Sequence, residues 1–138
     1  NVGLMEATAE HVKKHGGSIT GIITHRICDY GKASRLPDEL IRVDTLGERK
    51  QMMLDKADVF IALPGGFGTL DEIFTVIAAG HLGYHDKKVV FCNTNGFYNL
   101  LINQIELFYR ERFASPHYKN YYQIATNAEE CIRILENF

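Results

Sequence analysis

Residues 58–72 limit the folds available to this chain of 138 residues more than any other segment does. They begin with an apolar run (Asp-Val-Phe-Ile-Ala-Leu-Pro), continue with three glycines in four positions, and end with Thr-Leu-Asp-Glu. Consecutive rather than alternating apolar residues are typical of a strand that is buried on both faces, as in the centre of a parallel sheet. The segment therefore predicts a central strand over 58–64, a glycine-rich loop and a helix that begins at Thr69.

Strands and helices are predicted to alternate along the rest of the chain. Short β-branched or apolar runs predict four further strands, over 18–24, 41–44, 88–92 and 122–126. Helical spacing predicts helices from Leu4 to a left-handed glycine cap at 16–17, and over 46–57, 69–79, 97–113 and 127–135. Asn127 is a favourable N-cap for the last helix, and the irregular segment 25–39 is expected to form a surface loop.

Strands that alternate with helices at this spacing imply right-handed βαβ crossovers. We therefore expect a Rossmann-like α/β fold, in which helices cover both faces of a parallel sheet. No repeat, linker or low-complexity stretch divides the sequence, so residues 1–138 are expected to form a single nucleotide-binding domain.

Composition excludes several classes of function. The chain has 15 Lys and Arg against 17 Asp and Glu, a net charge of −2, which leaves no surplus of cations for coating nucleic acid. No apolar run approaches the ~20 residues that span a bilayer, and no basic-then-apolar leader is present. The three cysteines, Cys28, Cys92 and Cys131, are widely spaced and form no Cys-x-x-Cys pair. Reduced thiols and a cytoplasmic location are therefore expected, without a nucleic-acid or membrane partner.

The glycine-rich segment has the features of an anion site. In an open α/β sheet, ligands bind outside the carboxyl ends of the strands, where residues 65–69 are expected to lie. Glycines let backbone N–H groups approach an anion, and the helix N-terminus adds a favourable dipole. The segment is neither a Walker loop, because no Gly-Lys-Ser/Thr follows, nor the dinucleotide fingerprint, because the glycine spacing differs. It predicts a bound phosphate or a similar anion.

Two pairs of residues allow both a structural and a functional interpretation. Thr69 and Glu72 match a Thr-x-x-Glu capping box, which would only satisfy helix-end amides. The preceding proline and three glycines exceed what capping needs, however, and a carboxylate beside an anion site is repulsive unless it serves a transient cation. For Arg49 and Lys50 taken alone, the solvated face of a helix is favoured; the alternative is that they hold a phosphate from the side.

Other polar and aromatic residues favour structural roles. His81 and His85 have a spacing that metal sites use, but Gly83 lies between them and no glutamate accompanies them, so a helix end followed by a turn is favoured. The aromatic and apolar stripe over 100–113 lacks interleaved basic residues. It is expected to form core or a dimer face rather than a platform for bases.

Several of these segments together resemble one protein family. Residues 64–72, Pro-Gly-Gly-Phe-Gly-Thr-Leu-Asp-Glu, resemble the PGGxGTxxE signature of the Lonely Guy family, whose plant members are cytokinin riboside 5′-monophosphate phosphoribohydrolases. Similar family segments occur in the same order at residues 3–5, 48–53, 82–87 and 95–101. Many members carry the name "lysine decarboxylase", but the sequence shows no context for a pyridoxal-phosphate lysine.

The resemblance implies hydrolysis of the N-glycosidic bond of a purine nucleoside 5′-monophosphate, such as a cytokinin nucleotide or AMP, to free base and ribose 5-phosphate. Glu72 and Arg49 would then be the catalytic residues, with Glu72 facing the ribose. The other positions matching the family's binding residues are Gly3, Met5, Lys50, Gly65, Gly66, Gly68, Thr69 and Asp71. No metal or other cofactor is implied, and a homodimer or larger homo-oligomer is expected.

The chain also departs from the family pattern. Leu46 and Gly47 replace a Met-His pair that is frequent there, and Ala78-Ala79 replaces a common Thr-Trp, which bears on the choice of base. The family has a strand, a helix and a second strand ahead of its first glycine-rich loop, so the chain is expected to be N-terminally truncated. The alternative function is a non-catalytic nucleotide or phospho-ligand carrier, similar to the molybdenum-cofactor carrier proteins.

Overall fold

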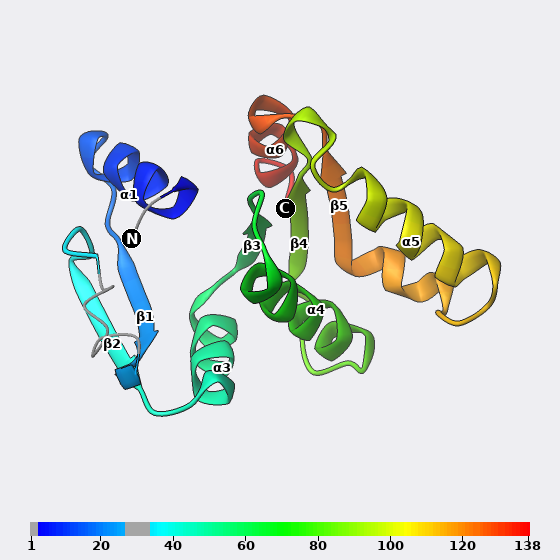
Figure 1. Cartoon of the computed structure of the whole chain (residues 1–138), viewed down its shortest axis with the longest axis horizontal. Helices are drawn as coiled ribbons and strands as arrows, with labels where there is room; N and C mark the ends of the chain where they lie inside the picture. The colour runs from blue at the N-terminus through cyan, green and yellow to red at the C-terminus, as the bar shows by residue number, and fades with distance from the viewer. Residues whose placement is uncertain (1–2, 27–33) are drawn as a thin grey trace. The chain divides into compact units, whose positions relative to one another are not determined.

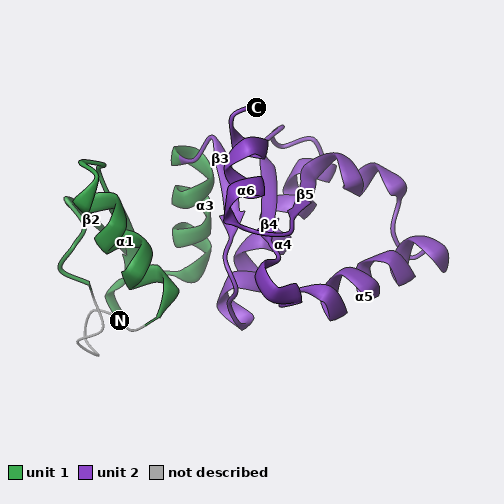
Figure 2. Cartoon of the chain, turned by 90° about the horizontal axis from the view of Figure 1, so that it is seen from above, with its two compact units in different colours: residues 1–56 green, residues 57–138 purple. Residues whose placement is uncertain are grey.

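The structure is a computed structural model that describes residues 3–26 and 34–138. The chain divides into two compact units, Asn1–Lys56 and Ala57–Phe138, which Figure 2 shows in different colours. The prediction of a single domain over 1–138 is not tested by this division and stays a prediction. Cys28 and most of the first half of the predicted loop 25–39 lie outside the described residues.

The described part of the first unit contains a pair of parallel strands and two helices. In chain order its described elements are α1 (Leu4–Lys14), β1 (Thr20–Thr24), β2 (Glu39–Val43) and α3 (Leu46–Lys56). The strands pair in register from Thr20↔Glu39 to Thr24↔Val43. The predicted left-handed cap of α1 is confirmed: Gly16 has φ +78°, and the Gly17 N–H donates to the Val12 carbonyl at 2.9 Å.

Helix α3 begins in a capping box that the sequence analysis did not assign. The Glu48 N–H donates to Thr45 Oγ1 at 3.0 Å, and Glu48 Oε2 accepts the Asp44 N–H at 2.9 Å. These bonds satisfy amides that the first helical turn leaves without a partner. The carboxylate of Glu48 therefore caps the start of α3, the helix that carries Arg49.

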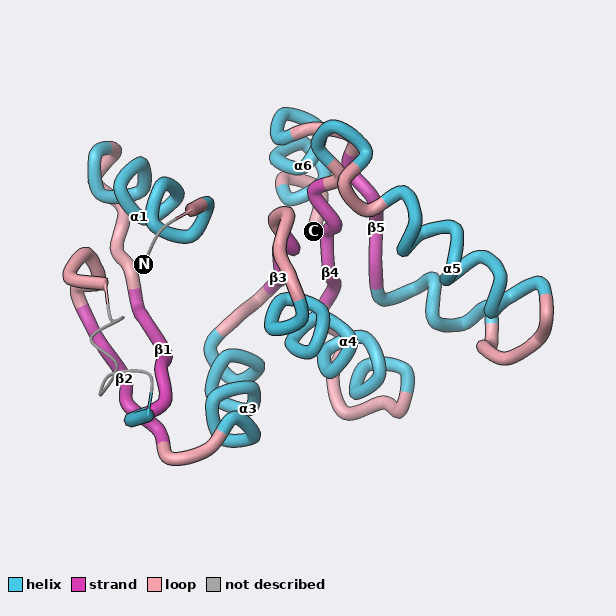
Figure 3. The backbone as a smooth tube through the Cα atoms, viewed as in Figure 1, coloured by secondary structure: helices cyan, strands magenta, loops and turns pink. Residues whose placement is uncertain are grey.

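The second unit is built on a three-stranded parallel sheet in the order β3-β4-β5 (Figures 1 and 3). Its elements are β3 (Val59–Ala62), α4 (Phe67–His81), β4 (Lys88–Cys92), η1 (Thr94–Gly96), α5 (Asn99–Arg110), η2 (Pro116–Tyr121), β5 (Tyr122–Ala125) and α6 (Ala128–Leu135). Asn127 caps α6 as predicted, because its side chain accepts the Glu130 N–H at 2.9 Å.

The central strand β4 separates two apolar layers. On one face, Val90 and Cys92 pack with Ala125 of β5 and Cys131 of α6. On the other face, the ring of Phe91 meets the rings of Tyr98 and Tyr122 edge to face, and Tyr122 lines a cavity together with residues of α4 and α5. Because side chains alternate along a strand, α6 covers the first face and α4 and α5 cover the second. Parallel strands flanked by helices confirm the predicted α/β class.

The position predicted for the strand over 58–64 is wrong in one respect. Within the described sheet, β3 pairs with β4 alone, and Ile61 is 44% exposed. The strand that is buried on both faces is β4, where Val89, Val90 and Phe91 are at most 1% exposed. The strands also form two sheets, β1-β2 and β3-β4-β5, rather than one. An apolar run reports burial but not strand order, and both β3 and β4 carry such a run.

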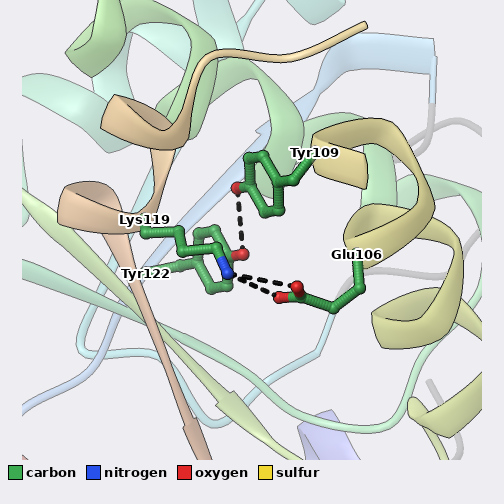
Figure 4. Close-up of polar contacts among 4 residues, drawn as sticks. All are labelled: Glu106, Tyr109, Lys119 and Tyr122. Carbon is green, nitrogen blue, oxygen red and sulfur yellow. Dashed lines mark hydrogen bonds and ion pairs between the residues drawn. The ribbon is translucent and has the colours of Figure 1, made fainter. Parts of the chain in front are cut away.

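Polar contacts join α5 to η2 and to the first residue of β5 (Figure 4). Lys119 Nζ lies 3.0 Å from Glu106 Oε1 and 4.6 Å from the centre of the Tyr109 ring. The hydroxyls of Tyr109 and Tyr122 lie 3.0 Å apart. Burial and the hydrogen bond to Tyr109 raise the pKa of Tyr122 well above its ordinary value, so the Tyr122 phenol stays protonated at neutral pH.

None of the helices in the described residues has the length and apolar character that a membrane crossing requires.

Candidate functional site

The sequence predicts an anion site at residues 65–69, which follow β3. We call residues 63–68 the glycine loop; they comprise the link between β3 and α4 and the first two residues of α4. The loop follows the carboxyl end of β3, and Gly66, Phe67 and Gly68 are exposed. Helix α4 begins at Phe67, with Gly66 as its N-cap and no side-chain capping bond. Backbone amides of its first turn are therefore left for an external acceptor, at the positive end of the helix dipole.

The capping-box interpretation of Thr69 and Glu72 is wrong. The helix begins two residues earlier than predicted, and its first backbone bond runs from the Leu70 N–H to the Gly66 carbonyl at 3.1 Å. Thr69 is thus already helical, and Glu72 lies almost two turns into α4. A capping residue must stand outside the helix, where its side chain can reach the first amides. Neither residue has that position here, whereas Thr45 and Asn127 do in α3 and α6.

Thr69 instead packs against Gly65. A Cβ atom built on Gly65 would lie 2.9 Å from Thr69 Cβ and closer still to the threonine hydroxyl, so only glycine fits there. By contrast, a Cβ atom on Gly66 or Gly68 would have no described atom within 4 Å. Glycine is thus needed for packing at Gly65 alone. At the other two positions it leaves the backbone open to a ligand.

The two acidic residues of the signature differ in exposure. Asp71 is exposed, and its backbone carbonyl accepts the Thr75 hydroxyl at 2.7 Å. Glu72 is half-buried and lies on the helix one turn after Gly68 and Thr69. The amides at the start of α4, which no side chain caps, could bind an anion. The Glu72 carboxylate, one turn further along the helix, could stabilise a nearby positive charge.

Sequence reasoning missed two residues behind the loop. The Tyr98 hydroxyl donates to the Leu63 carbonyl at 2.5 Å, and the Tyr98 N–H donates to Asn93 Oδ1 at 2.7 Å. Both side chains are buried. The sequence predicts a helix over 97–113 and a family resemblance over 95–101, but it assigns neither residue a role at the site. An asparagine that directly follows a buried strand and precedes a turn is the signal that would have drawn attention to them.

The remaining residues of the predicted site belong to the first unit. Arg49 and Lys50 are half-buried in α3, and Arg49 Nε donates to the Ile22 carbonyl of β1 at 2.8 Å. Arg49 is therefore not a fully solvated side chain. Gly3 is the N-cap of α1 with φ +109°, and Met5 is 73% exposed. That these four residues join the glycine loop in one site stays a prediction.

His81 and His85 lie at a helix end and in the turn that follows it, as the sequence predicts. His81 is the last residue of α4, Gly83 follows with φ +81°, and His85 Nδ1 accepts the Lys87 N–H at 3.1 Å. Within residues 3–26 and 34–138, no three His, Cys, Asp or Glu side chains are grouped so as to hold a metal ion.

Comparison with known proteins places the chain in a family. The family model described as "Possible lysine decarboxylase" matches residues 5–135, and the chain belongs to this family, as its resemblance to Lonely Guy proteins predicts. The chain is 38% identical to cytokinin riboside 5′-monophosphate phosphoribohydrolase LOG5 of Arabidopsis thaliana, over all of this chain and 60% of that protein.

Two further relatives have similar names. The chain is 36% identical to cytokinin riboside 5′-monophosphate phosphoribohydrolase LOG7 of Arabidopsis thaliana, covering 64% of it. It is 33% identical to the probable phosphoribohydrolase LOGL9 of Oryza sativa subsp. japonica, covering 61% of it. Both comparisons include the whole of this chain. The chain thus spans about three fifths of the length of these relatives.

Proposed function

We propose that this chain hydrolyses the N-glycosidic bond of a purine nucleoside 5′-monophosphate, releasing the base and ribose 5-phosphate. The observation that carries the proposal is the geometry of the glycine loop. Its amides lack a side-chain cap, Gly66 and Gly68 leave the backbone open, and Glu72 is not used for capping. The names of the relatives, which describe phosphoribohydrolases, support the same reaction.

The glycine loop would bind the 5′-phosphate. Backbone N–H groups at Gly66, Phe67 and Gly68 would donate to the phosphate oxygens, and the dipole of α4 would favour the negative charge. The phosphate does not react, so its binding energy is available to position the anomeric carbon of the ribose. Gly65 and Thr69 would hold the loop in the conformation that makes this possible.

Glu72 would act at the ribose. When the bond between C1′ and the purine nitrogen breaks, its electron pair leaves with the base, and the sugar becomes an oxocarbenium-like cation. A carboxylate beside that cation stabilises it and can accept the proton of the water that attacks C1′. That proton is then taken up by the departing purine nitrogen, which gives the neutral base and restores the carboxylate. This role accounts for an acidic residue near a phosphate, where its charge would otherwise be unfavourable.

Arg49, Lys50, Gly3 and Met5 would complete the site from the first unit. Arg49, whose Nε donates to the Ile22 carbonyl, would bind the nucleotide through its guanidinium group. Lys50 would add charge alongside, and Asp71 would contribute with the rest of the signature. We also propose AMP as a minimal substrate, a homodimeric assembly and a cytoplasmic location, on the basis of the family resemblance.

Product analysis tests the reaction class. The complete protein that contains this chain is incubated with AMP, with a cytokinin riboside 5′-monophosphate and with adenosine, and base and ribose 5-phosphate are measured by chromatography. We expect equal amounts of both products from the nucleotides, and at least ~100-fold slower release from adenosine, because phosphate binding energy is missing. Arg49→Ala should slow the reaction by a similar factor. Bound AMP without products would contradict the proposal and indicate a carrier.

A further inference from the structure

Tyr98 is buried directly behind the glycine loop. It is 2% exposed, and its ring packs edge to face on Phe91 at 5.3 Å and on Phe97 at 4.9 Å. Burial raises the pKa of Tyr98, an effect that the Gly65 backbone amide opposes. The phenol is therefore a hydrogen-bond donor over the whole physiological pH range.

Hydrogen bonds through Asn93 connect the backbone of Tyr98 to the ends of β4 and β5. Asn93, which directly follows β4, accepts the Tyr98 N–H through Oδ1 at 2.7 Å. The Asn93 N–H in turn donates to the Ala125 carbonyl of β5 at 2.7 Å, and Asn93 Nδ2 donates to Asn99 Oδ1 at 2.9 Å. These bonds fix the N-terminus of α5 relative to the sheet. The Tyr98 hydroxyl is thus a rigid donor rather than one on a mobile side chain.

The Tyr98 hydroxyl donates to the glycine loop at the point where the pairing of β3 with β4 ends. The pairing of β3 with β4 stops at Ala62↔Phe91, so Leu63 is the first residue beyond it. Pro64, the next residue, has no N–H with which to continue the ladder. The Leu63 carbonyl accepts the Tyr98 hydroxyl at 2.5 Å instead. The other end of the loop is fixed by Thr69 against Gly65.

We infer that Tyr98 is a positioning residue for phosphate binding: it holds the Leu63 carbonyl and thereby sets the direction of the loop amides. The inference rests on the proposed function, because it assigns the phosphate to the same loop. Tyr98 does not touch the phosphate. Its loss should therefore weaken binding of the phosphorylated sugar and leave binding of the free base unchanged.

The test compares Tyr98→Phe with Tyr122→Phe in the complete protein. Each variant loses one phenol hydroxyl and keeps the ring, but the Tyr122 hydroxyl bonds Tyr109 and not the loop. The dissociation constants of ribose 5-phosphate and of adenine are measured by calorimetry, and folding is checked by thermal unfolding. The loss of one well-placed hydrogen bond predicts an approximately tenfold weaker ribose 5-phosphate affinity for Tyr98→Phe alone. Adenine affinity should change in neither variant.

Each outcome has a separate meaning. Equal ribose 5-phosphate affinities for the two variants would overturn the inference, as would a parallel loss of adenine affinity in Tyr98→Phe, which indicates general disorder. Wild-type protein that binds ribose 5-phosphate but releases no adenine from AMP would overturn the proposed function, while the comparison of affinities still decides the role of Tyr98. Wild-type protein that does not bind ribose 5-phosphate would overturn both.

Discussion

The side chain of Thr69 occupies the space into which a side chain on Gly65 would project. One turn of α4 and the loop that precedes it are therefore packed against each other by a threonine and a glycine. The contact between Thr69 and Gly65 and the Tyr98–Leu63 hydrogen bond together fix the conformation of the glycine loop. The loop is thus held by packing and hydrogen bonding and does not depend on the conformational freedom of glycine.

The Gly65–Thr69 contact predicts that alanine at Gly65 is damaging. The added methyl group would force Thr69 out of its position, at a cost of about 1–3 kcal/mol of unfolding free energy, which denaturant unfolding measures. Phosphate affinity should fall as well, because the loop moves with Thr69. A Gly65→Ala protein with wild-type stability would contradict the packing.

Gly68→Ala is the matched control. Gly68 is helical and a Cβ atom there would have space, so alanine should raise stability, by up to about 1 kcal/mol. The methyl group would lie beside the proposed phosphate, however, so ribose 5-phosphate affinity should fall. Stability and binding are thus expected to change in opposite directions at Gly68 and in the same direction at Gly65.

The capping box of α3 predicts a local effect for Thr45→Ala. The Glu48 N–H loses its acceptor, which should cost about 1 kcal/mol and speed hydrogen exchange at that amide. Thr8→Ala provides the comparison, since Thr8 lies inside α1 and its hydroxyl donates to the Leu4 carbonyl one turn back. This substitution should leave stability within about 0.5 kcal/mol of wild type.

The phenol pair of Tyr109 and Tyr122 predicts non-additive substitutions. Either single change to phenylalanine should cost about 1 kcal/mol, because the partner hydroxyl loses its hydrogen bond. The double variant should cost about as much as one single variant, because the second change removes a hydroxyl that is already unpaired. Denaturant unfolding of the four proteins measures this, and strictly additive losses would show that the hydroxyls do not interact.

His85 predicts a loss of stability in mild acid. Burial lowers its pKa, an effect that Lys87 strengthens and that Asp86 and the Val76 backbone oppose. The folded state therefore prefers the neutral ring, and the unfolded chain takes up a proton near pH 6.5. The contribution of the neutral ring is complete above that pH and is lost as the pH falls through 6.5 toward the lowered value in the folded state.

Denaturant unfolding between pH 7.5 and 5.5 measures this effect. His85→Gln keeps a side-chain acceptor for the Lys87 N–H but cannot be protonated, so its stability should fall less over that range than that of the wild type. Equal pH dependence in His85→Gln and the wild type would show that His85 does not contribute.

Local features of the fold were predictable where one residue decides the backbone. Gly16 and Asn127 end and begin their helices as expected, because a positive φ and a side-chain acceptor are properties of single residues. The position of β3 in its sheet was not predictable, since an apolar run such as 59–62 reports burial and not which strands are neighbours.

The candidate site was predictable in its motif but not in its geometry. Thr69-x-x-Glu72 and Thr45-x-x-Glu48 have the same pattern, yet only the second forms a capping box. The difference arises because Gly66 already serves as the N-cap of α4, three residues before the predicted start at Thr69. Tyr98 lies 35 residues after Leu63, and a single sequence does not report a contact over that distance.

The most direct test of the account is the rate of adenine release from saturating AMP by Glu72→Gln, measured with the AMP dissociation constant. If Glu72 stabilises the developing cation, the rate should fall at least ~100-fold while AMP affinity stays within a few-fold of wild type. A Glu72→Gln protein that releases adenine at the wild-type rate would show that this carboxylate takes no part in the reaction and would contradict the account.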